Sequence, residues 1–150
     1  MTNYTIRKAQ RDDVGAIVRM LADDQLSATR DDPRDLEPYL GAFDHIDADP
    51  NQLLVVVVSD NEPVGTLQLT IIPGLARRGA LRGQIEAVRI RADHRGSGLG
   101  ANLIRWAINE SRQRGCALVQ LTSDVSRTDA HRFYERLGFA PSHTGFKLKL

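Results

Sequence analysis

Apolar residues recur at helical spacing in several segments of the chain. The first segment has apolar residues on one helical face: Val14, Ile17, Val18 and Leu21. It predicts a helix that begins near Asp12 and is broken by Asp-Asp-Pro at 31–33. Later segments predict helices around residues 36–43, over 99–112 and over 129–137, where Gly115 and Gly138 supply the stops.

Aliphatic runs between these helices predict strands. The clearest is 53–58, which is almost purely aliphatic and predicts a buried strand. Residues 59–62 are predicted to form a turn that returns the chain as a hairpin partner over 64–72. Other strands are predicted over 4–7, 85–90, 117–121 and, from a weaker alternation, 146–150. A basic, glycine-bearing loop is predicted over 73–83; it carries Arg77, Arg78 and Arg82.

Length and composition restrict the class of protein. The 150 residues predict one domain, 1–150, and 41% apolar with 26% charged residues is ordinary for a globular chain. A net charge of +1 indicates neither a nucleic-acid nor a membrane partner, and no apolar run is long enough to span a membrane. No secretion signal is visible, and the single cysteine, Cys116, excludes an internal disulfide. We therefore expect a cytoplasmic protein.

Charge is concentrated in one segment. Residues 23–50 contain nine acidic residues against Arg30 and Arg34, a local charge of −7. Two interpretations are open: a solvated helical surface, or an acidic rim that attracts a cationic substrate. The four histidines are scattered without the spacing of a metal site, so no metal is expected.

The segment 95–100, Arg-Gly-Ser-Gly-Leu-Gly, lies between a predicted strand and a predicted helix. Strand, glycine loop and helix start in this order predict a phosphate-binding site, because the first N–H groups of a helix are unpaired and its dipole favours an anion. A nucleoside-triphosphate loop is excluded, since Gly100 is followed by Ala-Asn and not by Lys-Ser/Thr. The dinucleotide pattern is matched by Gly96, Gly98 and Ala101, but the βαβ units that should follow it are missing.

A second segment, 130–139, reads Ala-His-Arg-Phe-Tyr-Glu-Arg-Leu-Gly-Phe. Residues 85–100 and this segment resemble motifs A and B of the GCN5-related N-acetyltransferases, the acetyl-CoA-dependent GNAT family. The family pattern Gln/Arg-x-x-Gly-x-Gly/Ala falls on Arg95, Gly98 and Gly100. The order of elements from Tyr4 to Leu150 also follows the family. The resemblance implies an α/β fold, with a mixed, mostly antiparallel sheet of about six to seven strands flanked by helices.

The resemblance implies direct transfer of acetyl from acetyl-CoA to an amine, in a small molecule or a peptide. The loop N–H groups would cradle the CoA pyrophosphate, with a charge-assisted contact from Arg95. The preceding strand, splayed from its neighbour, would bind the pantetheine arm and the thioester carbonyl through its backbone. The cofactor-binding residues so implied are Val88, Arg89, Ile90, Arg95, Gly96, Ser97, Gly98, Leu99, Gly100, Ala101 and Arg127. Many family members have asparagine where this chain has Arg127, which is either a CoA-phosphate contact or a solvated arginine at a helix start.

The resemblance also implies catalytic residues. Tyr134 lies where the family places the general acid that protonates the departing thiolate, and a phenol with a pKa near 10 is protonated at neutral pH. Where some members carry a glutamate base, this chain has Gln84, which cannot accept a proton. Glu86 lies two residues later on the same face of the strand, and we expect it to act through water. Its alternative role is to orient a backbone group or to pair with an arginine.

Two classes of function remain open at this point. The first is an N-acetyltransferase; the second is a non-catalytic, CoA-binding regulatory module. The acidic segment predicts a cationic acceptor, whereas the arginines of 77–82 predict an anionic one or a phosphate of CoA. Many family members are dimers, so a second copy of the chain is a candidate partner.

Overall fold

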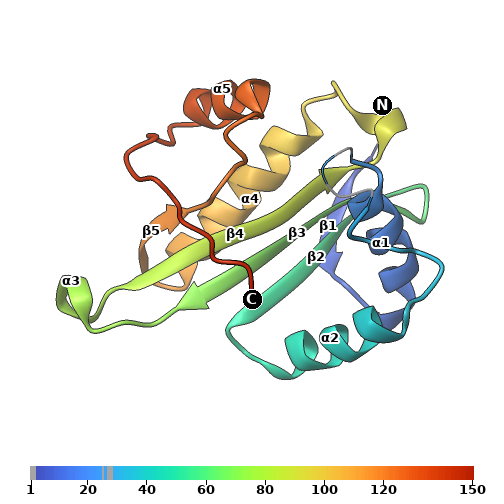
Figure 1. Ribbon diagram of the computed structural model, residues 1–150, viewed down its shortest axis with the longest axis horizontal. Coiled ribbons are helices and arrows are strands. Elements are labelled where there is room, and N and C mark those ends of the chain that lie inside the picture. The colour runs from blue at the N-terminus through green and yellow to red at the C-terminus, as the bar shows by residue number, and fades with distance from the viewer. Residues whose placement is uncertain (1–2, 25, 27–28) are drawn as a thin grey trace.

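The computed structural model describes residues 3–24, 26 and 29–150, and within them the chain forms one five-stranded sheet. The strands follow the order of the chain across the sheet (Figure 1): β1 (Thr5–Lys8), β2 (Gln52–Ser59), β3 (Glu62–Ile72), β4 (Leu81–Ile90) and β5 (Cys116–Gln120). The pairs from β1 to β4 are antiparallel, and β5 is parallel to β4. The parallel pair needs a crossover, which α4 (Leu99–Gln113) supplies.

Helices cover both faces of this sheet, and the sheet separates two hydrophobic core clusters. α1 (Val14–Ala22) and α2 (Glu37–Ala48) pack on one face, around Val18, Phe43 and Val56. On the other face α4 and α5 (Thr128–Arg136) pack on a larger cluster centred on Leu67, Leu103 and Ile104. Short one-turn helices, η1 (Arg11–Asp13), α3 (Ala76–Gly79) and η2 (Ala92–His94), occupy the connections. The sheet and its helices therefore position the loops that connect them, which are described below.

The α/β class and the mostly antiparallel sheet are confirmed, but two sequence predictions are wrong. The described residues form five strands and not six or seven, because 146–150 is not a strand and its apolar side chains are exposed. α1 ends at Ala22 and does not continue to 31–33. Its apolar periodicity stops after Leu21, and the aspartates at 23 and 24 are unfavourable at the negative end of a helix.

A β-bulge interrupts β4 in its middle. Thr66 of β3 pairs with Arg89 and Gln68 pairs with Glu86, so two residues of β3 span three of β4. Ala87, inside this step, has a φ of 55°. Residues three apart on a regular strand point to opposite faces, whereas this bulge places Glu86 and Arg89 on the same face. They are one pleat repeat apart, about 6.6 Å along the sheet.

The bulge makes a prediction about stability at position 87. A positive φ costs a non-glycine residue about 1–2 kcal/mol, and glycine loses about 0.5–1 kcal/mol of unfolded-state entropy relative to alanine. We therefore expect Ala87→Gly to leave the free energy of unfolding unchanged or raise it by up to about 1 kcal/mol, and Ala87→Val to lower it by about 1–3 kcal/mol. Urea denaturation measures both. A stable valine variant beside a destabilised glycine variant would contradict the bulge.

Candidate active site

The sheet opens between β4 and β5. Their pairing runs from Leu81 to Gln84 on β4 and from Cys116 to Gln120 on β5, after which β4 continues to Ile90 paired only with β3. At the last paired position the Gln120 Nε2 donates a hydrogen bond to the Gln84 Oε1, at 2.8 Å. The β4 backbone from 85 to 90 therefore has no strand beside it on this edge in the described chain. Such an edge can hydrogen-bond an extended ligand in place of a strand.

The glycine loop lies at the end of this opening. Gly96 and Gly98 have φ values of 79° and 82°, in the left-handed region that favours glycine, and α4 begins directly after them. The first hydrogen bond of the helix runs from the N–H of Asn102 to the carbonyl of Gly98, at 3.1 Å. The N–H groups of 99–101 precede that bond and are available to an anion. A Cβ added at Gly96 or Gly98 would meet no atom within 4 Å, so there is space before the loop.

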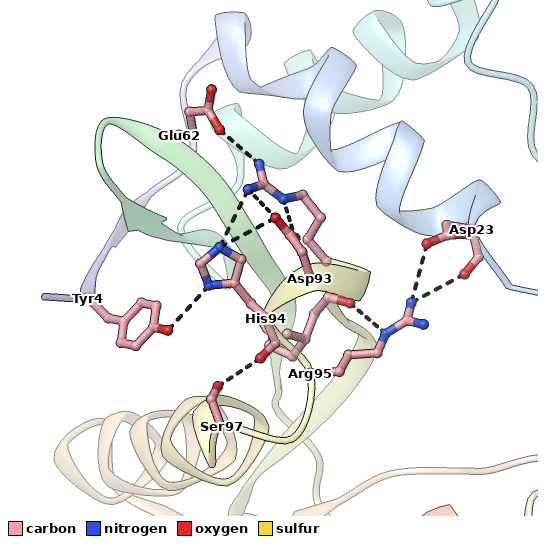
Figure 2. Close-up of polar contacts among 9 residues, drawn as sticks. Tyr4, Asp23, Glu62, Asp93, His94, Arg95 and Ser97 are labelled. Carbon is pink, nitrogen blue, oxygen red and sulfur yellow. Dashed lines mark hydrogen bonds and ion pairs between the residues drawn. The ribbon is translucent and has the colours of Figure 1, made fainter. Parts of the chain in front are cut away.

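Polar contacts connect this loop to the neighbouring elements (Figure 2). The Ser97 hydroxyl donates to the His94 carbonyl at 2.7 Å, and the His94 ring lies 3.2 Å from the Tyr4 hydroxyl. The Arg95 Nε donates to the Ile90 carbonyl at 3.0 Å, and its Nη2 lies 3.5 Å from the Asp23 carboxylate. Arg95 thus ties the loop to β4 and to the end of α1. A contact of Arg95 with a pyrophosphate stays a prediction.

Tyr134 of α5 lies beside the opening. Its ring packs edge to face on Phe133 and Phe139, at centroid distances of 5.2 and 5.9 Å. Burial raises the pKa of Tyr134 above its ordinary value of 10.0, and the charges of Arg127 and Arg89 oppose that rise. The hydroxyl is therefore protonated at neutral pH. The electrostatic influence of both arginines shows that α5 and β4 bring these three side chains into one region.

The comparison with known families now decides the class of this fold and site. Residues 17–139 match the acetyltransferase (GNAT) family. The chain belongs to this family. Members of the GNAT family use acetyl-CoA, and the open glycine loop and the free edge of β4 suit the pyrophosphate and the arm of that molecule.

Individual relatives are similar to this chain to different extents. It is 35% identical over 98 residues to the aminoalkylphosphonate N-acetyltransferase of Salmonella typhimurium, covering 65% of this chain and 63% of that protein. It is 38% identical over 87 residues to the glucosamine 6-phosphate N-acetyltransferase of Trypanosoma brucei brucei, covering 58% and 57%. These matches span less than two thirds of either relative. A crystal structure of a transcriptional regulator from Bacillus halodurans C-125 is 43% identical over 99% of this chain and 100% of that chain, with a TM-score of 0.95.

Glu86 lies on the sheet face that α1 and α2 cover. Its partner in the register is Gln68, and the partner of Gln84 is Thr70, so Glu86 and Gln84 share one face as the strand alternation predicts. The Glu86 side chain is exposed, and Gln84 is engaged by Gln120. A role for Glu86 as the base of the GNAT reaction stays a prediction.

Arg89 is a candidate site residue whose side chain the sequence analysis did not assign. Only 15% of this side chain is exposed; its Nη1 donates to the Val88 carbonyl at 2.9 Å, and its Nη2 lies 3.5 Å from the Asp24 carboxylate. Burial lowers the pKa of Arg89, with Asp24 opposing this and Arg127 and Arg30 adding to it. The guanidinium therefore lies between its partner Asp24 and two other arginines, near Tyr134.

An apolar cavity of about 180 Å³ adjoins the same face of the sheet. Its wall includes Val18 and Leu21 of α1, Tyr39 and Phe43 of α2, and Ala87 at the bulge. The cavity therefore adjoins the stretch of β4 that carries Glu86 and Arg89. Sequence periodicity marks the helical residues as core but gives no sign of a space between them.

The arginines of the loop after β3 lie elsewhere. Arg77 and Arg78 are in α3, which precedes the start of β4, whereas the glycine loop follows its end. The ten residues of β4 place these two ends about 30 Å apart. Figure 1 shows α3 at the far end of the sheet from α1 and the N-terminus. The structure therefore does not bring residues 77–78 to the glycine loop.

No helix among the residues that the structure describes is both long and apolar enough to cross a membrane. Within the same residues, no three His, Cys, Asp or Glu side chains come together as a potential metal site.

The left-handed conformation of Gly98 yields a binding prediction. Gly98→Ala places a Cβ at a φ that costs about 1–2 kcal/mol, so the loop is expected to relax away from its cradle and the Kd for acetyl-CoA to rise about tenfold. Isothermal titration calorimetry measures this Kd. Gly41→Ala is the matched control, because Gly41 lies exposed in α2 with no atom within 4 Å of an added Cβ. An equal change of Kd in both variants, or none in Gly98→Ala, would contradict the role of the loop.

Proposed function

We propose that this protein transfers the acetyl group of acetyl-CoA to the amine of a small molecule that also carries an anionic group. The observation that carries the transfer is the convergence, within a GNAT fold, of the glycine loop, the free edge of β4 and the partly buried Tyr134. The anionic group is supported separately by Arg89 and by the named substrates of two relatives.

The loop and β4 hold acetyl-CoA in this proposal. The N–H groups from Gly96 to Ala101 receive the pyrophosphate, and the edge of β4 from Val88 to Ile90 receives the pantetheine arm. A β4 N–H near the bulge then faces the thioester carbonyl and stabilises the negative charge that develops on its oxygen. Arg127, at the start of α5, acts electrostatically on Tyr134 and contacts a phosphate of CoA or the acceptor in this proposal.

Tyr134 of α5 and Glu86 of β4 move the protons in this proposal. The neutral amine nitrogen attacks the thioester carbon, and the carbon–sulfur bond breaks as the amide forms. Tyr134 donates its proton to the departing thiolate, and its raised pKa keeps that proton available. Glu86 accepts the surplus proton of the amine through water, and the products are the acetylated amine and CoA.

The ion pairs of the acidic segment 23–50 bear on the charge of the acceptor. Six of the nine acids in 23–50 form ion pairs, as the following contacts show: Asp23–Arg95, Asp24–Arg89, Asp31–Arg30, Asp32–Arg34, Asp44–Arg11 and Asp47–Lys8. Paired carboxylates attract a cation less than free ones do. The relatives named for an aminoalkylphosphonate and for glucosamine 6-phosphate both act on amines with an anionic group. We therefore favour an anionic acceptor over a cationic one.

Thiol release from acetyl-CoA across a panel of amines tests this function. The panel spans aminoalkylphosphonates, amino sugar phosphates, amino acids, polyamines, aminoglycosides and short peptides. We expect release with amines that carry a phosphonate or phosphate. Mass spectrometry should find a product that is about 42 Da heavier than the amine, because an acetyl group has replaced a hydrogen. Equal rates with polyamines would contradict the anionic acceptor, and no release with any amine would contradict the transfer.

Glu86→Gln tests the base. In this proposal water links Glu86 to the amine, and bulk water can partly replace the carboxylate as proton acceptor. We therefore expect kcat to fall about tenfold near pH 7. The rate should recover as the pH rises, because more of the amine is then neutral. The measurement is the pH profile of kcat. Glu37→Gln, at the exposed start of α2, should leave that profile unchanged. A profile that Glu86→Gln does not alter would remove this residue from the mechanism.

A second candidate is the non-catalytic, CoA-binding regulatory module. The neighbour from Bacillus halodurans, described as a transcriptional regulator, favours it. A regulator would bind acetyl-CoA with the same loop but release no thiol with any amine. Calorimetric binding of acetyl-CoA in the absence of turnover would support this candidate, and turnover with any amine would argue against it.

A further inference from the structure

The apolar cavity between the sheet and the helices α1 and α2 has no role in the acetyl transfer described above. Apart from Tyr39, Thr66 and Gln68, every residue that lines it is apolar. Ala87, in its wall at the bulge, is exposed, whereas Val18 in the same wall is buried. The cavity therefore leads from the surface beside the bulge into the core.

The three polar side chains in the wall already have hydrogen-bond partners. The Thr66 hydroxyl donates to a backbone carbonyl of β2, at 3.0 Å. The Gln68 Nε2 donates to the Gln52 Oε1 at 2.9 Å, and the Tyr39 hydroxyl donates to the Asp31 carboxylate at 3.0 Å. A buried water needs about two to four polar partners, so an apolar group suits this space better than water does.

The floor of the cavity lies one strand away from the groups proposed to meet the acceptor. In the register of β3 with β4, Gln68 lies opposite Glu86, and Thr66 lies opposite Arg89. Residues opposite each other in an antiparallel pair share a face, with Cβ atoms about 4.5–5.5 Å apart. The groups proposed to take the amine proton and to bind the anion therefore adjoin the cavity on one face of the sheet.

Given the proposed transfer to an anionic amine, we infer that the acceptor also carries an apolar group, which occupies this cavity. Glu86 and Arg89 would then hold the polar end of the acceptor, and the wall formed by α1 and α2 would select its apolar body. A protein cavity of about 150 Å³ binds benzene. The space here, about 180 Å³, therefore accommodates one phenyl ring or a branched aliphatic chain.

The acceptor suits this cavity better than the acyl chain of a longer acyl-CoA does. In the proposed arrangement the coenzyme lies along the edge of β4 that faces β5. The cavity lies on the other side of β4, since its floor is formed by residues of β2 and β3. An acceptor held by Glu86 and Arg89 lies over the same face as the cavity. Faster transfer from butyryl-CoA than from acetyl-CoA would assign the cavity to the acyl chain and overturn the inference.

A series of aminoalkylphosphonates tests the size of the apolar group. The amine and the phosphonate stay fixed, while the substituent on the carbon between them grows from methyl through propyl and isobutyl to benzyl. Burying one methylene group is worth about fourfold in affinity, so kcat/KM should rise about fourfold with each added carbon until the cavity is full. A flat or falling series, with turnover of the methyl compound, would overturn the inference and leave the proposed transfer intact.

Substitutions in the wall separate a size-selecting cavity from a general effect on folding. Ala42→Leu narrows the cavity and should move the preferred substituent towards methyl, whereas Leu21→Ala enlarges it and should move the preference beyond benzyl. Ala48→Leu is the matched control, because Ala48 is exposed on the same helix and does not line the cavity. Shifts in the same direction in both wall variants, or no shift in either, would overturn the inference.

Binding of phosphonates without an amine distinguishes failure of the cavity from failure of the transfer. Methylphosphonate and benzylphosphonate are titrated calorimetrically into the protein in the presence of CoA. We expect benzylphosphonate to bind about thirtyfold more tightly, and Ala42→Leu to remove this difference. The preference in the absence of thiol release with any amine would support the cavity and refute the transfer. Equal Kd values would overturn the cavity as a binding site, whatever the turnover.

Discussion

Tyr134→Phe is expected to lower kcat for CoA release by about 10²–10⁴-fold, while the Kd for acetyl-CoA stays unchanged. The substitution removes one hydroxyl and keeps the ring, so the packing on Phe133 and Phe139 is preserved. What is lost is the proton that the departing thiolate would receive. Steady-state thiol release measures kcat, and calorimetry measures the Kd.

The pH profile provides a second signature of the same residue. Burial raises the folded-state pKa of Tyr134 above 10.0, so the hydroxyl remains a donor as far as that pH. The rate should therefore fall only as the pH climbs through the raised value, and this alkaline decline should be absent from Tyr134→Phe. Tyr4→Phe is the control for an indirect effect through the glycine loop, because the Tyr4 hydroxyl contacts His94, which supports that loop. An equal loss in both variants, or turnover that Tyr134→Phe does not change, would refute the general-acid role.

Much of the fold could be predicted because its helices and strands show clear hydrophobic periodicity. The aliphatic run in β2, the hairpin turn after it and the amphipathic helices each depend on neighbouring residues alone. The C-terminal strand was predicted wrongly for a related reason. The alternation from Phe146 to Leu150 is real, but a strand also needs a neighbour, and a local pattern does not say where that neighbour lies.

In the candidate site, too, local sequence predicts some features, whereas others depend on tertiary contacts. The glycine loop could be predicted, because glycines between a strand and a helix specify its backbone directly, and the φ values of Gly96 and Gly98 agree. The bulge at Ala87 could not, since alanine gives no sign of a positive φ and the shift depends on the register with β3. Regular strand alternation places Arg89 on the face opposite Glu86, because the two residues are three apart. Its side chain was therefore missing from the predicted site, although its backbone was included.

Arg89→Leu is expected to reduce kcat/KM for a phosphonate- or phosphate-bearing amine by about 10²-fold and to affect a neutral amine little. The guanidinium is largely buried beside the bulge, where a charge-assisted hydrogen bond to an anion is strong. Arg89→Lys should recover part of the loss, because lysine restores the charge but not the paired donors. Arg34→Leu is the matched control; Arg34 also pairs with an aspartate, but it is 88% exposed.

The neighbouring carboxylate separates binding of an anion from a purely structural role. In the structure Asp24 faces Arg89 at 3.5 Å, so an anionic acceptor has to compete with it for the guanidinium. If Arg89 only supports the fold through this ion pair, Asp24→Asn and Arg89→Leu should change KM for the anionic amine in the same direction. If Arg89 binds the acceptor, Asp24→Asn should lower KM for the anionic amine while Arg89→Leu raises it. Opposite signs in KM, with similar melting temperatures, would therefore assign the anion to Arg89, and equal signs would exclude it.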